Sequence, residues 1–146
     1  MTTPIVPEVV VRGDASGFVQ TIEVGPHHLV ADEPLAAGGT ATGPTPYDLL
    51  AAALGSCTSM TIAYFARREH LPLEAVTVRV RHSKVHAADC AACDTKERRV
   101  DRLECAIALT GPLSVEQRAE LLRIANKCPV HRTLTSKIDI HTSLVD

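Results

Sequence analysis

An uncharged run in the first half of the chain constrains its fold more than any other feature. The 18 residues from 49 to 66 carry no formal charge, and their apolar side chains recur at the three- and four-residue spacing of a helix. Thr45 supplies a capping hydroxyl, Pro46 suits the first helical position, and Asp48 places a carboxylate in the first turn. The sequence therefore predicts a long helix within residues 44–67, apolar or small on nearly every face and buried on most sides.

This run also reaches the lower length limit of a membrane span, which is about 18 residues. Its centre, residues 55–59, consists of Gly, Ser, Cys and Thr, and its ends lack a basic or aromatic belt, so we expect a core helix that a second helix approaches closely. Cys57 lies in the expected buried stripe, where a thiol either fills the core or takes part in chemistry. The stripe consists of Leu49, Leu50, Ala53, Leu54, Cys57, Met60, Thr61 and Tyr64.

Shorter patterns on both sides of this helix predict strands, and hence an α+β fold. Residues 4–32 read as a three-stranded antiparallel piece, and a loop rich in Gly and Pro follows over residues 34–46. Residues 71–85 and 100–109 are expected to form a long hairpin, with a polar tip at residues 86–99. A last strand is expected over residues 137–145. Ser114 and Gln117 form a capping box for a second helix that ends around Lys127.

Size, charge and cysteine content limit the classes of function. A chain of 146 residues fits a single domain, residues 1–146. The net charge of −2 and the scattered basic residues argue against nucleic acid or an anionic membrane as a partner. The start of the chain lacks the pattern of a signal peptide, so we expect a cytoplasmic protein. Five cysteines in such a protein favour redox, catalytic or metal-binding roles over a static disulfide framework.

Cys128 stands where the second helix ends and where Pro129 can open a new turn. Thiols near helix starts or cationic groups are shifted toward the thiolate, and Lys127, His131 and Arg132 are close in sequence. His131 is a candidate to orient or protonate this thiol, because histidine is widely used to carry protons. Cys57 and Cys128 can meet in space, although their spacing alone does not show that they do.

A second group of candidate ligands lies at the hairpin tip. His86, Cys90 and Cys93 supply half of a zinc site, and Cys105 and His82 complete four ligands only if the hairpin brings them close. A labile disulfide within the CxxC sequence and an unreactive tip are the alternatives. Cys105 itself, on an apolar strand face, is most simply a core residue. We expect that the protein has no metal or other cofactor and uses a thiol reductant as a co-substrate.

Two cysteine motifs, PYDLLAAALGSC in the central helix and CPVHRTL near residue 130, follow a Gly-rich loop. In this combination the chain resembles the OsmC/Ohr family of thiol peroxidases, which reduce organic hydroperoxides. The resemblance implies an α+β fold that forms an intertwined homodimer, with antiparallel sheets wrapped around two long central helices. It also implies that both active sites lie at the subunit interface.

Carried over by position, the resemblance makes Cys57 the peroxidatic thiol and Cys128 the resolving thiol. The sulfenic acid formed on Cys57 would condense with Cys128 to a disulfide, and a dithiol reductant would reset the pair.

The chain departs from the peroxidase members of this family at the start of the helix. Those members place a Glu after the helix-opening Pro, and an Arg pairs with it to steady the thiolate. Here Tyr47 follows Pro46, so that Glu is missing. Asp48 is the candidate to substitute for it from one place later, a shift of about 100° around the helix. Arg12 is the candidate for the Arg, and a solvated strand residue is its alternative.

Two functions from different classes are therefore predicted. The first is a cysteine-based peroxidase that acts on organic hydroperoxides, which the retained thiols favour. The second is a relative with the same fold that binds a small ligand or serves as a redox sensor without turnover, which the missing Glu favours. A zinc-stabilised structural module is a third reading that rests on the hairpin tip alone.

Overall fold

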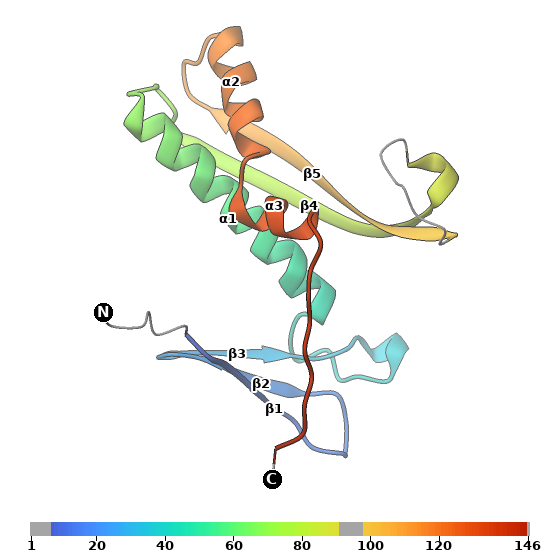
Figure 1. Ribbon diagram of the computed structural model, residues 1–146. Coiled ribbons are helices and arrows are strands. Elements are labelled where there is room, and N and C mark those ends of the chain that lie inside the picture. Colours follow the sequence, from blue (N-terminus) through green and yellow to red (C-terminus); the bar gives the residue numbers. More distant parts are fainter. Residues whose placement is uncertain (1–6, 91–97, 146) are drawn as a thin grey trace. The chain divides into compact units, whose positions relative to one another are not determined.

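The computed structural model describes residues 7–90 and 98–145, which form helices and antiparallel sheets (Figure 1). The chain divides into two compact units, Met1–Leu50 and Ala51–Asp146, and each has a sheet of its own. The long helix α1, Pro46–Arg68, begins in the first unit and continues in the second. That the two units act as one domain stays a prediction.

The first unit contains the predicted three-stranded antiparallel sheet. Its strands are β1 (Val9–Arg12), β2 (Gln20–Val24) and β3 (His27–Ala31), in the order β1-β2-β3. The central strand pairs with both neighbours, and Ile22 faces Val11 on one side and Leu29 on the other. Gly25 forms the tight turn between β2 and β3 at a positive φ of 56°, which glycine adopts without strain.

A buried carboxylate organises the loop that leads from β3 to α1. Asp32 is 2% exposed, and both of its oxygens accept hydrogen bonds from the loop. The donors are the backbone N–H groups of Glu33, Thr40 and Thr42 and the hydroxyls of Thr40 and Thr42, at 2.6–3.1 Å. A short 3-10 turn, Leu35–Ala37, lies within this loop. At Gly39 a Cβ atom would lie 1.9 Å from the Glu33 carbonyl oxygen, so only glycine fits there.

The start of α1 agrees with the prediction. The Thr45 hydroxyl accepts a hydrogen bond from the Asp48 backbone N–H at 3.1 Å, and the Asp48 carboxylate accepts one from the Thr45 backbone N–H at 2.9 Å. These reciprocal bonds satisfy two donors that the start of a helix otherwise leaves free. The helix is long and apolar enough, by length and composition alone, to cross a membrane.

The predicted hairpin forms the sheet of the second unit. Strands β4 (Ala75–His86) and β5 (Arg99–Thr110) pair antiparallel along their whole lengths, from Ala75 opposite Thr110 to His86 opposite Arg99. A 3-10 turn, Ala87–Asp89, follows β4. One face of this hairpin covers α1, as Figure 1 shows for the green helix beside the yellow-green and orange strands.

The buried face of α1 differs from the predicted stripe. The buried positions are Leu54, Gly55, Thr58, Ile62 and Ala66. At Gly55 a Cβ atom would lie 3.1 Å from Cγ2 of Val80, so strand β4 is the neighbour of the helix at this position. The close approach of a second helix stays a prediction. Met60 and Tyr64, which were expected to be buried, are 70% and 61% exposed.

Helix α2 (Val115–Ala125) completes the core of the second unit. Its predicted capping box is present, because Ser114 and Gln117 exchange hydrogen bonds of 2.9 and 3.1 Å. The Arg118 guanidinium ties the helix to the end of β5 by donating to the carbonyls of Leu109 and Gly111. The core cluster consists of Ile62 and Ala66 from α1 and Leu121 and Ala125 from α2. The short helix α3, Pro129–Leu134, follows α2.

The predicted last strand is wrong for this structure. Residues 137–145 have no regular secondary structure, although their apolar and polar residues alternate. A strand requires an edge that pairs with its backbone N–H and C=O groups. Within residues 7–90 and 98–145 the sheets contain only β1 to β3 and β4 with β5, and residues 137–145 pair with no edge of either sheet.

Candidate functional site

The structure brings together the two thiols that the sequence singled out. Cys57 lies on α1, Cys128 lies directly before α3, and their side chains are hydrogen-bonded to each other. Cys57 is half-buried, whereas Cys128 is completely buried. Both belong to the second unit, so the site is built within one compact part of the chain.

The backbone around Cys128 is fixed on both sides of the thiol. Its N–H donates to the Ala125 carbonyl at 3.2 Å, and its carbonyl accepts from the Arg132 N–H at 3.0 Å. Pro129 occupies the first position of α3, where its missing N–H and fixed φ cost little. The chain therefore turns directly after Cys128 and presents the next backbone N–H groups to its sulfur.

Cys128 is the sulfur with the more favourable surroundings for negative charge. Burial opposes its ionisation, but several hydrogen bonds outweigh burial and lower the pKa of its thiol. The donors are the Cys57 thiol, the His131 backbone N–H, the Thr58 hydroxyl and the Val130 backbone N–H. Hydrogen bonds to the charged form of a group favour that form.

Cys57 shows the opposite shift. Burial raises the pKa of its thiol, and so does the hydrogen bond that it gives to Cys128. The Val130 backbone N–H and the Thr61 hydroxyl act in the other direction but do not outweigh these effects. Each of the two thiols thus affects the ionisation of the other.

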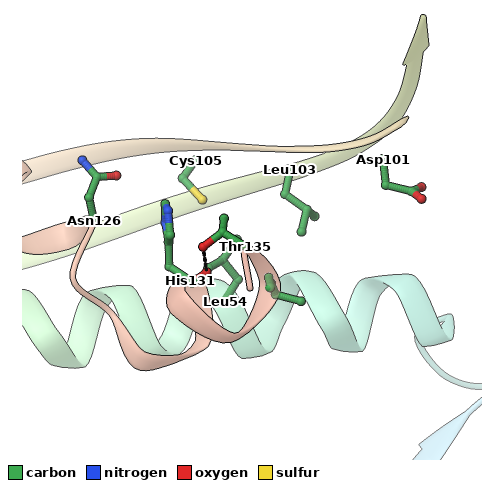
Figure 2. A pocket seen from close by; sticks show the side chains of 8 residues that line it. Leu54, Asp101, Leu103, Cys105, Asn126, His131 and Thr135 are labelled. Atoms are coloured by element: carbon green, nitrogen blue, oxygen red, sulfur yellow. Dashed lines mark hydrogen bonds between the residues drawn. The ribbon is translucent and has the colours of Figure 1, made fainter. Parts of the chain in front are cut away.

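A cavity of about 330 Å³ is lined by residues of α1, β5 and α3, as Figure 2 shows. His131 and Leu54 in its wall come from the same two elements as the thiols. The full lining is Leu54, Asp101, Leu103, Cys105, Asn126, His131, Leu134 and Thr135. Apolar side chains, a thiol and several polar groups thus share a space large enough for a small organic molecule.

Cys105 is part of this lining, so the prediction that it fills the core is wrong. Its residue number places it on the same face of β5 as the core residues Ile107 and Leu109, but the cavity leaves it exposed. Partial burial raises the pKa of the Cys105 thiol, and the negative charge of Cys128 raises it further. Cys105 is thus a third free thiol near the pair, less ready to ionise than Cys128.

His131 contributes to the site through both its backbone and its side chain. Its backbone N–H donates to the Cys128 sulfur, while its ring lines the cavity (Figure 2). The Thr135 hydroxyl donates to the His131 carbonyl at 2.9 Å and holds the turn of α3 closed. That the ring itself orients or protonates a thiol stays a prediction.

The two residues expected to steady the thiolate lie in the first unit. The Arg12 guanidinium pairs with the Glu23 carboxylate at 2.7 Å on the surface of the sheet, and the Asp48 carboxylate caps α1 through Thr45. Arg12 thus belongs to a surface ion pair of the sheet, and Asp48 belongs to the N-terminal cap of α1. A role of Arg12 or Asp48 at the thiols stays a prediction.

The proposed zinc ligands are described in part. His86 ends β4, and Cys90 forms a disulfide, so the oxidised Cys90 does not offer a thiolate to a metal. Cys93 lies outside the described residues. In the part of the chain that the structure describes, no group of three or more His, Cys, Asp or Glu side chains is arranged to hold a metal ion. His82 instead pairs with Asp101 at 2.7 Å.

Sequence reasoning missed the groups that surround the Cys128 sulfur. Thr58 is 3% exposed, and its buried hydroxyl next to Cys57 was a signal that could have been noticed. Buried hydroxyls need a hydrogen-bond partner, and in this helix the thiol of Cys128 is that partner. The backbone N–H groups of Val130 and His131 carry no signal in the side-chain sequence.

Comparison with known proteins places the chain in one family. A family model described as OsmC-like protein matches residues 39–143, which is more than half of the chain. No curated protein matches the chain. Among solved structures, an OsmC-like protein from Mycoplasma pneumoniae has a TM-score of 0.72 at 18% identity, with 99% of this chain and 100% of that chain covered.

Two further solved structures carry functional names. An organic hydroperoxide resistance protein OsmC from Legionella pneumophila has a TM-score of 0.68 at 18% identity, covering 94% of this chain and 95% of that chain. The organic hydroperoxide resistance protein OhrB of Bacillus subtilis has a TM-score of 0.63 at 18% identity, covering 94% and 96%. At these identities the structures show a shared α+β fold.

Proposed function

The chain belongs to the OsmC-like protein family, and from this premise we propose that it is a thiol-dependent peroxidase that reduces organic hydroperoxides. The observation that carries the proposal is the contact between the Cys57 and Cys128 thiols. A cavity of about 330 Å³, lined in part by Leu54 of α1 and His131 of α3, supports it. The names of the Legionella and Bacillus relatives agree with this activity.

In the proposed cycle the Cys57 sulfur attacks the distal oxygen of the hydroperoxide. The O–O bond breaks, the alkoxide leaves and takes up a proton to become an alcohol, and Cys57 becomes a sulfenic acid. The Cys128 sulfur then attacks the Cys57 sulfur, the S–O bond breaks, and hydroxide leaves to form water. Two thiols are thereby oxidised to one disulfide, and the peroxide is reduced by two electrons.

A dithiol reductant would restore the thiols by exchange with the Cys57–Cys128 disulfide. The proposal needs no metal or other cofactor, since both redox steps take place on sulfur. Proteins of this family are generally soluble homodimers, and we extend that assembly and a cytoplasmic location to this chain.

The test is a titration of the fully reduced protein with one equivalent of cumene hydroperoxide. Thiol counting and peptide mapping under non-reducing conditions should show the loss of two thiols, a Cys57–Cys128 disulfide and one equivalent of cumyl alcohol. Cys105, the third free thiol, is the internal comparison and should remain a thiol in the same sample. Oxidation no faster than that of a free thiol would refute the proposal.

Two variants separate the roles of the thiols. Cys57→Ser should abolish turnover, since the attacking sulfur is gone. Cys128→Ser should still allow one sulfenic acid to form on Cys57, detectable by a dimedone adduct, but should block recycling through the disulfide. Equal residual turnover in the wild type and Cys57→Ser would contradict the assignment.

A redox sensor without useful turnover is the second candidate, and the raised pKa of Cys57 favours it. A sensor would form the same disulfide slowly, so repeated additions of peroxide and dithiothreitol would consume peroxide no faster than dithiothreitol alone. Sustained consumption of peroxide over many cycles would decide for the enzyme.

A further inference from the structure

The cavity between α1, β5 and α3 has a thiol of its own. Among the described residues that line it, Cys105 is present and neither Cys57 nor Cys128 is. Figure 2 shows that the Cys105 sulfur points from β5 toward α3, and that the His131 ring points from α3 toward β5. A molecule held in this space therefore meets one thiol and one imidazole, and not the pair of thiols that the peroxidase cycle uses.

The rest of the lining favours a small, neutral and partly apolar molecule. All three elements supply an apolar side chain, namely Leu54, Leu103 and Leu134. The carboxylate of Asp101 already pairs with His82 at 2.7 Å and with Lys84 at 3.1 Å, and no Lys or Arg is among the described lining residues. At about 330 Å³ the space is at the small end of protein ligand pockets, which measure roughly 300–1,000 Å³.

We propose that Cys105 is a second reactive site of the protein, which captures small neutral α,β-unsaturated carbonyl compounds in this cavity with the His131 ring as proton carrier. Conjugate addition suits the cavity because it consumes one thiol and forms no intermediate that a second thiol must resolve. A peroxide would instead leave a sulfenic acid on Cys105, with no resolving thiol in the described lining. The proposal goes beyond the peroxidase function, since it uses neither thiol of that cycle.

The imidazole is both needed and available for this chemistry. Partial burial raises the pKa of the Cys105 thiol, so the sulfur keeps its proton at neutral pH and its attack requires a base. Within residues 7–90 and 98–145 no hydrogen bond occupies the ring nitrogens of His131, so the ring can accept a proton. Histidine is a common proton carrier for this reason.

The addition balances without an oxidant or a reductant. A ring nitrogen of His131 takes the thiol proton as the Cys105 sulfur attacks the β-carbon of the unsaturated carbonyl compound. A C–S bond forms, the π bond between the α- and β-carbons breaks, and its electron pair passes to the carbonyl as an enolate. The ring then returns the proton to the α-carbon, which leaves a stable thioether on Cys105.

Site-resolved labelling of the reduced full-length protein at pH 8 tests the cavity. N-propylmaleimide and 3-maleimidopropionic acid carry the same reactive double bond on chains of similar length, but the first is neutral and the second anionic. Relative to N-acetylcysteine, Cys105 should prefer the neutral probe by about tenfold, because an apolar lining without Lys or Arg disfavours a carboxylate. Equal preference at Cys105 and at N-acetylcysteine would overturn the proposal.

The open-chain member trans-2-hexenal tests the class of compound. Peptide mapping after borohydride reduction should find its thioether on Cys105, and a Cys105 that stays unmodified would contradict the proposal. Leu134→Phe fills part of the cavity and should abolish the preference for the neutral maleimide. Leu144→Phe is the matched control, because Leu144 is 100% exposed and outside the lining. A folded Leu134→Phe variant with the wild-type preference would show that the cavity does not select the probe.

His131→Ala tests the proton carrier. It should slow labelling of Cys105 by about a hundredfold, the lower end of what general base catalysis contributes, and added imidazole should restore part of the rate. A merely structural role of the ring would not be rescued in this way, so a rate that imidazole leaves unchanged would remove His131 from the mechanism. Arg132→Ala is the control on the same helix, because Arg132 is exposed and does not line the cavity. These assays contain no peroxide, so their outcome is independent of the proposed peroxidase activity.

Discussion

Two buried acidic groups in this chain are surrounded by the same kinds of hydrogen-bond donor. The Asp32 carboxylate is surrounded by the hydroxyls and backbone N–H groups of Thr40 and Thr42, and the Cys128 sulfur by the Thr58 hydroxyl and neighbouring backbone N–H groups. None of these hydrogen-bond donors is a cationic side chain. At the residue scale, threonine hydroxyls and backbone N–H groups in turns thus supply the hydrogen bonds to these two buried acidic groups.

Asp32 provides a prediction about acid stability. Hydrogen bonds from Thr40 first and then Thr42 lower the pKa of its carboxyl well below the ordinary value of 3.8. A carboxyl whose pKa is lower in the folded than in the unfolded state stabilises the fold above its unfolded pKa, and this stabilisation is lost as pH falls toward the folded pKa. Asp32→Asn should therefore lower the thermal midpoint at pH 7 and weaken its fall between about pH 5 and pH 2.

Thermal unfolding followed by circular dichroism across this pH range measures both effects. Asp139→Asn is a suitable control, because the Asp139 side chain is 84% exposed and should change neither quantity. If Asp32→Asn retained the acid dependence of the wild type, the hydrogen bonds to Asp32 would not be its origin.

The site was predictable from the sequence only in part. Cys57 and Cys128 could be chosen because their motifs are specific, and the structure brings them into contact. Thr58 and the Val130 N–H were missed, since the direction of a hydroxyl or an amide depends on how α1 and α3 meet. Cys105 was placed on the correct face of its strand, but the sequence gives no sign of the cavity that exposes it.

At the scale of the elements, capping residues and local sequence patterns predicted where most helices and strands lie. They did not predict which elements pack against one another. The capping residues Thr45 and Ser114 marked the starts of α1 and α2 correctly, because capping depends on a few adjacent residues. The buried face of α1 was predicted less well. Its residues are apolar or small on nearly every face, so helical periodicity could not choose between Met60, which is exposed, and Ile62, which is buried.

Gly55 tests how closely α1 packs on β4. A methyl group there would meet Cγ2 of Val80 at 3.1 Å, which is a tight contact. Gly55→Ala should change the free energy of unfolding by less than about 1 kcal/mol, since the gain in helix propensity of ~1 kcal/mol offsets this contact. Gly55→Leu has no such room and should destabilise the protein by about 1–3 kcal/mol.

Urea unfolding of both Gly55 variants measures these changes. Ala119→Leu on the exposed face of α2 is the control, and it should leave the free energy of unfolding nearly unchanged. A Gly55→Leu variant as stable as the wild type would mean that α1 can move away from β4 at little cost.

At the scale of the whole molecule, two parts of the chain lack a packing or pairing partner among the described residues. The face of α1 opposite the hairpin exposes Met60 and Tyr64, and residues 137–145 alternate like a strand but pair with no strand among the described residues. Exposed apolar surface of this kind often marks a protein interface. These features agree with the homodimer that the family resemblance predicts, and that assembly stays a prediction for this chain.

The homodimer prediction can be tested on α1 itself. A carboxylate at an apolar interface loses its hydration without gaining a partner, so Met60→Glu and Tyr64→Glu should each shift the protein from dimer to monomer in sedimentation velocity. Val115→Glu is the matched control, because Val115 is 79% exposed on α2 and should leave the dimer intact. Dimers of unchanged stability in both α1 variants would show that this face is not the interface. Monomers that keep the Cys57–Cys128 chemistry would instead show that each chain carries a complete dithiol site, as the contacts within the second unit suggest.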